Sequence, residues 1–124
     1  MVGIGREPSA VGPSRGDIHL VDFPEIGGHV IRGPHPAVIV LTDRMRRSTT
    51  SLVAPMTSAP RSAEHRPPYL VPVTARQSGL QRDGFVKCDQ VSTVPGPLIG
   101  PRLGRLNPES LDRVDTAVRF VLGL

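Results

Sequence analysis

Proline and glycine interrupt this chain so often that only short structural elements fit between them. The 124 residues include 14 prolines and 13 glycines, and the longest apolar run is the short segment 37–41. Proline and glycine are turn residues, and many turns joined by short elements favour a β-rich fold. Because aromatic residues make up 3% of the chain and Trp is absent, the core must be aliphatic. No apolar run is long enough to cross a bilayer, so we expect no membrane partner.

The size and charge of the chain limit the classes of function that it can have. A length of 124 residues fits one domain. The net charge is +4, and every cation other than Lys87 is arginine. A small basic domain favours a polyanionic partner, most simply nucleic acid, and the guanidinium fork suits phosphate. The single cysteine and the lack of a leader pattern favour the cytoplasm. The four histidines and Cys88 lack zinc-like spacing, so we expect no metal and no cofactor.

The alternation of apolar and turn residues predicts a mainly β domain. We expect strands over residues 18–23, 37–41, 51–56, 69–73 and 85–90, and a short one over 103–106. The continuous β-branched run in 37–41 predicts burial on both faces of its strand. Pro72 predicts an edge strand or a bulge. Residues 1–14 have no periodicity and are predicted to be a mobile arm, so the domain spans residues 15–124.

A helix is predicted at the C-terminal end. Asn107 is a good N-cap, Pro108 is tolerated at the first helical position, and Glu109 favours the first turn. Gly123 suits the helix end. An apolar stripe at helical spacing is expected to pack on the sheet; it consists of Leu111, Val114, Val118, Val121 and Leu122.

The segment 84–94 holds the first candidate site residues. Lys87 and Asp89 are two positions apart, so on an extended strand they project from the same face. A neighbouring base and acid could transfer protons to and from one substrate. The alternative is an ordinary surface ion pair worth ~0–1 kcal/mol. Cys88 lies between them and is expected to be a core contact rather than a nucleophile.

Further candidates could contact phosphate. Residues 24–36 are predicted to form a long loop, either a binding loop or a plain solvated one. His29, Arg32 and His35 lie in this loop. Thr57 and Ser58 end a predicted strand, where their hydroxyls could donate to a phosphate oxygen or only cap a turn.

Several motifs, in this order, resemble the MazF/PemK/Kid family of toxin endoribonucleases. The resemblance extends over residues 15–124. It rests on Arg-Gly-Asp-Ile-His-Leu-Val-Asp at 15–22, Pro-Ala-Val-Ile-Val at 36–40, Ala-Pro-Met-Thr-Ser at 54–58 and Cys-Asp-Gln-Val-Ser-Thr-Val at 88–94. No single motif is specific, but their shared order is.

The resemblance implies an SH3-like barrel of twisted antiparallel strands with a C-terminal helix. It also implies a homodimer that acts as the toxin of a type II toxin–antitoxin system. Such toxins cleave single-stranded RNA without a metal ion. The 2′-hydroxyl attacks the adjacent phosphorus, and the products carry 2′,3′-cyclic phosphate and 5′-hydroxyl ends. A cognate antitoxin blocks the RNA groove with a disordered acidic tail.

The same resemblance implies roles for individual residues. Asp89 corresponds to a catalytic base, and Lys87 stands where that branch of the family has an arginine acid. Thr57 and Ser58 correspond to the hydroxyl pair that holds the phosphate. His29 corresponds to a supporting histidine.

The chain departs from the family pattern at His35, which precedes Pro36 where most members have arginine. Histidine can act as acid and base near neutral pH but lacks the two-pronged grip of arginine on phosphate. The acid is therefore either His35 or Lys87. We expect Arg32 to reach into the site and, with Gln90, to contact RNA. The alternative function is a non-cleaving module of the same fold, either a gyrase-poison-like protein or a degenerate binder of RNA or antitoxin.

Overall fold

The structure is a computed structural model that describes residues 12–58 and 66–124. Most of the predicted N-terminal arm, residues 1–11, and residues 59–65 lie outside the described residues. Residues 12–14 contact the body of the domain, since the Gly12 N–H donates to the Arg46 carbonyl at 2.6 Å. In the described residues no helix is long and apolar enough to cross a membrane.

The elements follow one another closely along the chain. The strands are β1 (Asp17–Phe23), β2 (Gly33–Ile39), β3 (Thr50–Thr57), β4 (Leu70–Val73), β5 (Gly84–Lys87), β6 (Ser92–Pro95) and β7 (Ile99–Arg105). The helices are α1 (Ala75–Ser78) and α2 (Pro108–Leu122), with the short 3-10 helices η1 (Asp43–Met45), η2 (Cys88–Gln90) and η3 (Gly96–Leu98).

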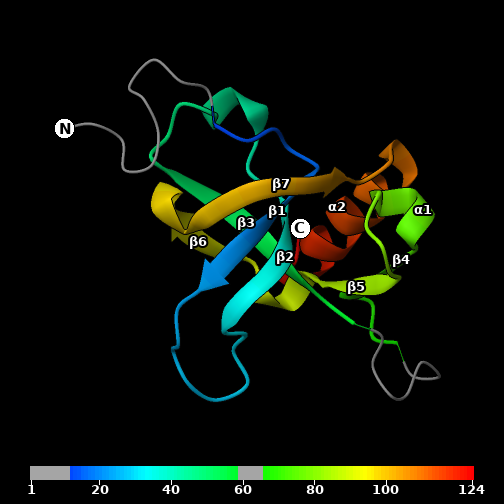
Figure 1. The fold of residues 1–124 in the computed structure, drawn as a ribbon. Coiled ribbons are helices and arrows are strands. Elements are labelled where there is room, and N and C mark those ends of the chain that lie inside the picture. The colour runs from blue at the N-terminus through cyan, green and yellow to red at the C-terminus, as the bar shows by residue number, and fades with distance from the viewer. Residues whose placement is uncertain (1–11, 59–65) are drawn as a thin grey trace.

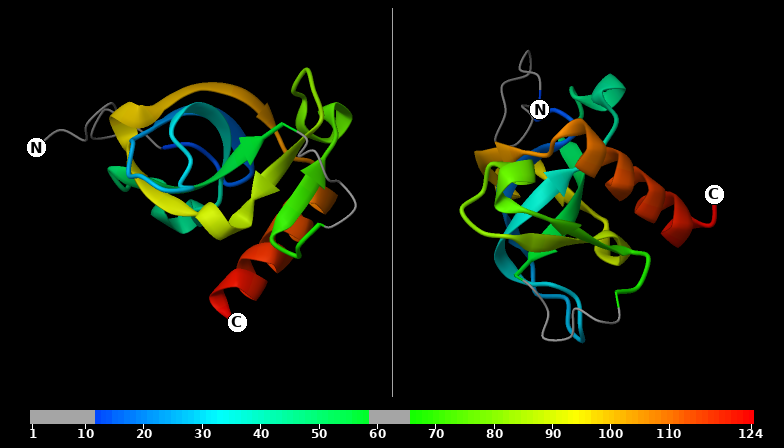
Figure 2. Two further views of the ribbon diagram at one scale, coloured as in Figure 1. Left: turned by 90° about the horizontal axis from the view of Figure 1, so that it is seen from below. Right: turned by 90° about the vertical axis from the view of Figure 1, so that its right-hand side faces the viewer.

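The strands form one curled antiparallel sheet with the order β4-β5-β3-β2-β1-β7 (Figure 1). One edge of β3 pairs with β2, while the other pairs first with β6 and then with β5. Seen from below, the strands curve around a common centre and α2 lies beside them (Figure 2). The predicted mainly β fold with a C-terminal helix is confirmed, but the sheet does not close into a complete barrel.

The core occupies both faces of the sheet, as the β-branched run predicted. Val38 is fully buried in one apolar cluster, which also contains Val114 and Ala117 of α2. Ala37 and Ile39 point to the opposite face and are fully buried in a second cluster, with Val21 and Phe23 of β1. Side chains alternate across a strand, so β2 and β3 contribute to both clusters and lie at the centre of the core.

Helix α2 begins and ends where the sequence predicted. The Asn107 side chain accepts from the Ser110 N–H at 2.9 Å, and Gly123 adopts a left-handed φ of 73° after the last turn. One part of the prediction is wrong. Within the stripe, Val114 is buried in the first cluster and Leu111 and Val118 pack against it, but Val121 and Leu122 are 40% and 64% exposed. The last turn of α2 carries these two side chains out to solvent.

Two boundaries differ from the sequence-based expectation. The loop after β1 ends at residue 32, and β2 begins at Gly33. Pro34 and Pro36 are tolerated because this end of β2 pairs with β1 and not with β3. The last strand, predicted over 103–106, begins earlier, because η3 and then β7 follow β6 directly and β7 spans Ile99–Arg105. The prediction that Pro72 marks an edge strand is confirmed, because Pro72 lies on β4 at the edge of the sheet.

A short helix was also missed. Residues 75–78 form α1, which begins with a reciprocal capping box between Thr74 and Gln77. It ends at Gly79, whose φ is +76°. The Gly79 N–H donates to the Ala75 carbonyl at 2.8 Å. These caps fix the direction in which the chain leaves α1 towards β5.

Candidate functional site

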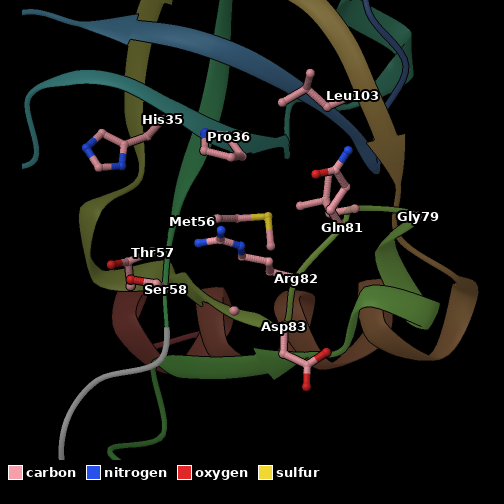
Figure 3. A pocket seen from close by; sticks show the side chains of 12 residues that line it. His35, Pro36, Met56, Thr57, Ser58, Gly79, Gln81, Arg82, Asp83 and Leu103 are labelled. Carbon is pink, nitrogen blue, oxygen red and sulfur yellow. The ribbon is translucent and has the colours of Figure 1, made fainter.

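A cavity of about 610 Å³ opens at the end of β3 (Figure 3). The pairing of β2 with β3 stops at Ala37 and Pro55, so the residues beyond that point border a gap instead of continuing the sheet. The segment 79–84 between α1 and β5 forms the facing wall, and Leu103 of β7 lines the rim. A cavity of this size accepts a ligand as large as a nucleotide.

Three predicted site residues meet at this cavity. His35 comes from β2, and Thr57 and Ser58 come from the end of β3. The His35 ring packs edge-on against Phe23, with ring centroids 6.5 Å apart and an interplanar angle of 60°. Within the described residues, the side chains of His35, Thr57 and Ser58 have no hydrogen-bond or ion-pair partner. Their donors and acceptors are therefore available to a ligand.

Lys87 and Asp89 are arranged differently from the prediction. The strand ends at Lys87, and Cys88–Gln90 form the 3-10 turn η2. The prediction that the two side chains share one strand face is therefore wrong, and no ion pair joins them in the described part of the chain. Lys87 does share a sheet face with Thr57, because Thr57 pairs with Phe85, two residues earlier on β5.

Asp89 lies apart from the cavity at the end of β3. It is exposed and borders two depressions, one against the loop after β1 and one against α2. The structure therefore places the predicted site residues in two groups. One group is His35, Thr57 and Ser58; the other surrounds η2.

The predicted residues of the loop after β1 are held by local contacts. The Arg32 guanidinium donates to the Glu25 carboxylate at 3.0 Å, and both side chains are exposed. Arg32 does not line the cavity at His35, so this structure does not support a role for it there. His29 is exposed on the same loop, and its carbonyl accepts from the Gln90 amide at 3.0 Å.

Cys88 is fully buried in the first apolar cluster. Burial, together with the nearby Asp89 and Asp115 carboxylates, raises the pKa of its thiol to about 12. A thiol with so high a pKa is not a nucleophile near neutral pH. The prediction that Cys88 is a core contact is confirmed.

Sequence reasoning missed the functional potential of the segment 79–84. Its Arg-Asp-Gly motif at 82–84 has the composition of a turn, and the sequence alone assigns it no contact with a ligand. Asp83 anchors the segment, because its Oδ1 accepts from the Ala75 N–H at 2.7 Å. Gly84 lets β5 approach β3, since a Cβ there would lie 2.8 Å from the Thr57 carbonyl oxygen. The signal that could have revealed this wall was Arg82, a cation in the turn that precedes β5.

The fold defines a class of small domains built on one curled antiparallel sheet with a C-terminal helix. The model of the PemK-like, MazF-like toxins of type II toxin–antitoxin systems matches residues 14–122, and the chain belongs to that family. Among curated relatives, Endoribonuclease EndoA of Bacillus subtilis is 28% identical over 111 residues, covering 89% of this chain and 94% of that protein. Endoribonuclease MazF9 of Mycobacterium tuberculosis is 28% identical over 116 residues, covering 89% and 96%.

Solved structures share the fold. An endoribonuclease in complex with its cognate antitoxin, from a mycobacterial species, superimposes with a TM-score of 0.73 at 23% identity, covering 91% of this chain and 97% of that one. MazF from Deinococcus radiodurans superimposes with a TM-score of 0.74 at 20% identity, covering 94% and 100%.

Proposed function

We propose that this chain is an endoribonuclease toxin that cleaves single-stranded RNA without a metal ion. The observation that supports the proposal is the meeting of His35, Thr57 and Ser58 at one open cavity, each without a partner among the described residues. Unpartnered hydroxyls beside an imidazole suit a phosphate group, which needs several donors. The curated relatives bear the name endoribonuclease.

The proposed reaction needs three kinds of group. A base takes the proton of the 2′-hydroxyl as the O2′–P bond forms. An acid gives a proton to O5′ as the P–O5′ bond breaks, which leaves 2′,3′-cyclic phosphate and 5′-hydroxyl ends. Donors stabilise the additional negative charge on the phosphoryl oxygens in the transition state.

The described residues offer candidates for each role. Thr57 and Ser58 are placed to donate to the phosphoryl oxygens. His35 lies beside them and can transfer a proton, and Lys87 shares the sheet face of Thr57. Asp89 is proposed as the base from the η2 side, which requires the reacting 2′-hydroxyl to lie between the cavity and η2, within hydrogen-bond reach of the Asp89 carboxylate.

Two protein partners belong to this proposal. An apolar surface protrudes at the end of the chain, where Phe120 is 58% and Leu124 is 86% exposed. Exposed apolar surface of this kind marks a protein contact, and we propose a second copy of the chain and a cognate antitoxin with an acidic tail as partners. The net charge of +4 favours an acidic antitoxin segment. A cytoplasmic location follows from the RNA substrate.

The test is incubation of the purified protein with a long single-stranded RNA in EDTA, followed by end-group analysis. Fragments with cyclic phosphate and 5′-hydroxyl ends support the proposal. Alanine variants of His35, Thr57, Lys87 and Asp89 then assign the roles, with a loss of about 10²-fold or more expected for a residue that contacts the reacting groups. RNA that stays intact at high protein concentration would favour the alternative of a non-cleaving binder.

A further inference from the structure

We propose that Arg82 and Leu103 form a nucleotide subsite next to the reacting group, with Arg82 binding a backbone phosphate and Leu103 contacting the base. The inference rests on the proposed function, because it assigns further residues to the same RNA-binding surface. Both residues line the cavity that also holds His35 and Thr57.

The charges of the cavity lining favour an anion at Arg82. Among its residues, Arg82 and Asp83 carry the formal charges, and His35 is the remaining titratable group. The Asp83 carboxylate accepts from the Ala75 N–H and points away from Arg82 (Figure 3). The exposed Arg82 guanidinium has no ion-pair or hydrogen-bond partner among the described residues. An unpaired guanidinium facing hydroxyl groups is well suited to a phosphate.

The segment that carries Arg82 is fixed at both ends. On the α1 side, the left-handed Gly79 and the Asp83 hydrogen bond hold it against the helix start. On the β5 side, Gly84 packs against the backbone of Thr57. Arg82 therefore extends from a rigid base towards the end of β3, opposite His35 and Thr57 (Figure 3). A strand of RNA that reaches Thr57 would cross this gap with Arg82 on its other side.

The apolar part of the lining distinguishes RNA from an acidic peptide. Leu103 at the rim is 40% exposed, and Met56, which lines the same cavity, is 3% exposed. A cavity lined by both apolar side chains and a cation suits a nucleotide, because a flat base lies close to its own phosphate. The side chains of aspartate and glutamate offer no comparable apolar face, so we favour RNA over an acidic protein segment.

Salt dependence of RNA binding tests the phosphate contact. The probe is an RNA oligonucleotide that spans the mapped cleavage site and carries a 2′-deoxy substitution there, so that it binds without being cut. Arg82→Ala is expected to weaken binding about tenfold and to reduce the slope of log K against log salt by about 0.7, the value for one phosphate contact on a single strand. Arg76→Ala is the matched control, because Arg76 is exposed on α1 and does not line the cavity. An unchanged slope in Arg82→Ala would overturn the assignment.

Replacing the charged linkages of the RNA one at a time identifies the phosphate that Arg82 binds. Each linkage of the oligonucleotide is replaced in turn by an uncharged methylphosphonate. In the wild-type protein one linkage beside the cleavage site should weaken binding, and in Arg82→Ala the same replacement should have no further effect. Additive effects at every linkage would contradict the contact. An abasic nucleotide next to that linkage should likewise weaken binding to the wild type but not to Leu103→Ser.

These outcomes separate the subsite from the nuclease proposal. If the wild type cleaves RNA and Arg82→Ala matches it in KM and in salt slope, the nuclease stands and the subsite fails. If the wild type leaves RNA intact, the nuclease proposal fails. The subsite is then tested by binding alone, by comparing the salt dependence of the wild type and Arg82→Ala on a mixed-sequence oligonucleotide. If Arg82→Ala keeps the wild-type salt dependence of RNA binding but loses affinity for polyglutamate, the cavity binds an acidic protein segment and the RNA assignment is wrong.

Discussion

The side chain of Gln90 is bound to the backbone of Ile31, whose N–H donates to the Gln90 Oε1 at 2.7 Å. The other end of the same amide donates to the His29 carbonyl at 3.0 Å. One side chain in η2 thus holds the loop after β1 at two points. The oxygen and the nitrogen of the amide are both engaged, so Gln90 positions the loop on this surface.

Replacing Gln90 should release this loop. Gln90→Ala is expected to lower the free energy of unfolding by about 1 kcal/mol and to speed hydrogen exchange at the Ile31 amide. Gln90→Glu keeps the acceptor for the Ile31 N–H and loses the donor to the His29 carbonyl. The Ile31 amide should therefore stay protected from hydrogen exchange in this variant. Gln81→Ala is the control, since the Gln81 amide has no hydrogen bond within the described residues. Unchanged Ile31 exchange in Gln90→Ala would contradict the role.

Cys88 should be unreactive in the folded protein. Its pKa is raised to about 12 by burial and by the nearby carboxylates of Asp89 and Asp115, so the thiolate is scarce at pH 8. We expect no labelling by a maleimide or a disulfide reagent until the protein is unfolded. Cys88→Ala should lose about 1 kcal/mol of stability and keep its activity on RNA. Rapid labelling of the native protein, or loss of cleavage in folded Cys88→Ala, would contradict this account.

The parts of the fold that were predictable are those fixed by neighbours along the chain. Asn107, Pro108 and Gly123 bound α2 because capping depends on a few adjacent residues. The β-branched run of β2 predicted burial on both faces because both of its faces meet apolar clusters. The hydroxyl pair at the end of β3 was recognisable because it follows directly on a buried strand.

The parts that were not predictable depend on contacts between distant segments. The turn after Lys87 looks like continued strand in sequence, yet Gln90 bends back to bind a loop about 60 residues earlier. Arg32 was expected in the site, but Glu25 on the same loop holds it. In sequence, Arg82 looks like an ordinary turn residue. Its place at the cavity depends on the close packing of Gly84 against the Thr57 backbone, which brings the segment 79–84 to the cavity wall.

Gly84 should be sensitive to the addition of one methyl group. A Cβ at this position would lie 2.8 Å from the Thr57 carbonyl oxygen, so β3 and β5 must move apart beside the site. Gly84→Ala is expected to cost about 1–3 kcal/mol of stability and, because Thr57 is displaced, to lower cleavage by about 10²-fold.

The matched control for this prediction is Gly100→Ala. A Cβ at Gly100 would lie 2.9 Å from the Leu20 carbonyl oxygen, a similar clash away from the cavity. Both variants should show lower thermal stability, but at a temperature where each is fully folded only Gly84→Ala should lose cleavage. Equal activity of the two variants would show that the spacing between β3 and β5 does not position Thr57.

Asp17 should make the stability of the protein depend on acid pH. Burial alone raises the pKa of this carboxyl, but the Arg105 hydrogen bond, the Ser14 N–H and the Arg102 charge outweigh burial, so the pKa is lowered overall. Its Oδ1 lies 2.6 Å from Arg105 Nη1 and 3.3 Å from Arg102 Nε. These contacts tie the start of β1 to β7, beside residues 12–14.

The direction of the pH effect follows from the lowered pKa. The folded protein holds this proton less tightly than the unfolded chain, so the stabilisation is complete above the ordinary carboxyl range, about pH 4. It is lost as the pH falls through the folded-state pKa, where protonation removes the charge that both arginines contact. Asp17→Asn should therefore lower the free energy of unfolding at pH 7 by about 2 kcal/mol and flatten its decline in acid, measured by urea unfolding from pH 7 to pH 3. The control is Asp112→Asn, which removes an exposed carboxylate on α2 that has no ion pair among the described residues. It should change neither the free energy of unfolding at pH 7 nor its decline in acid. If Asp17→Asn unfolds with the wild-type pH dependence, the arginine contacts at the start of β1 do not stabilise the fold.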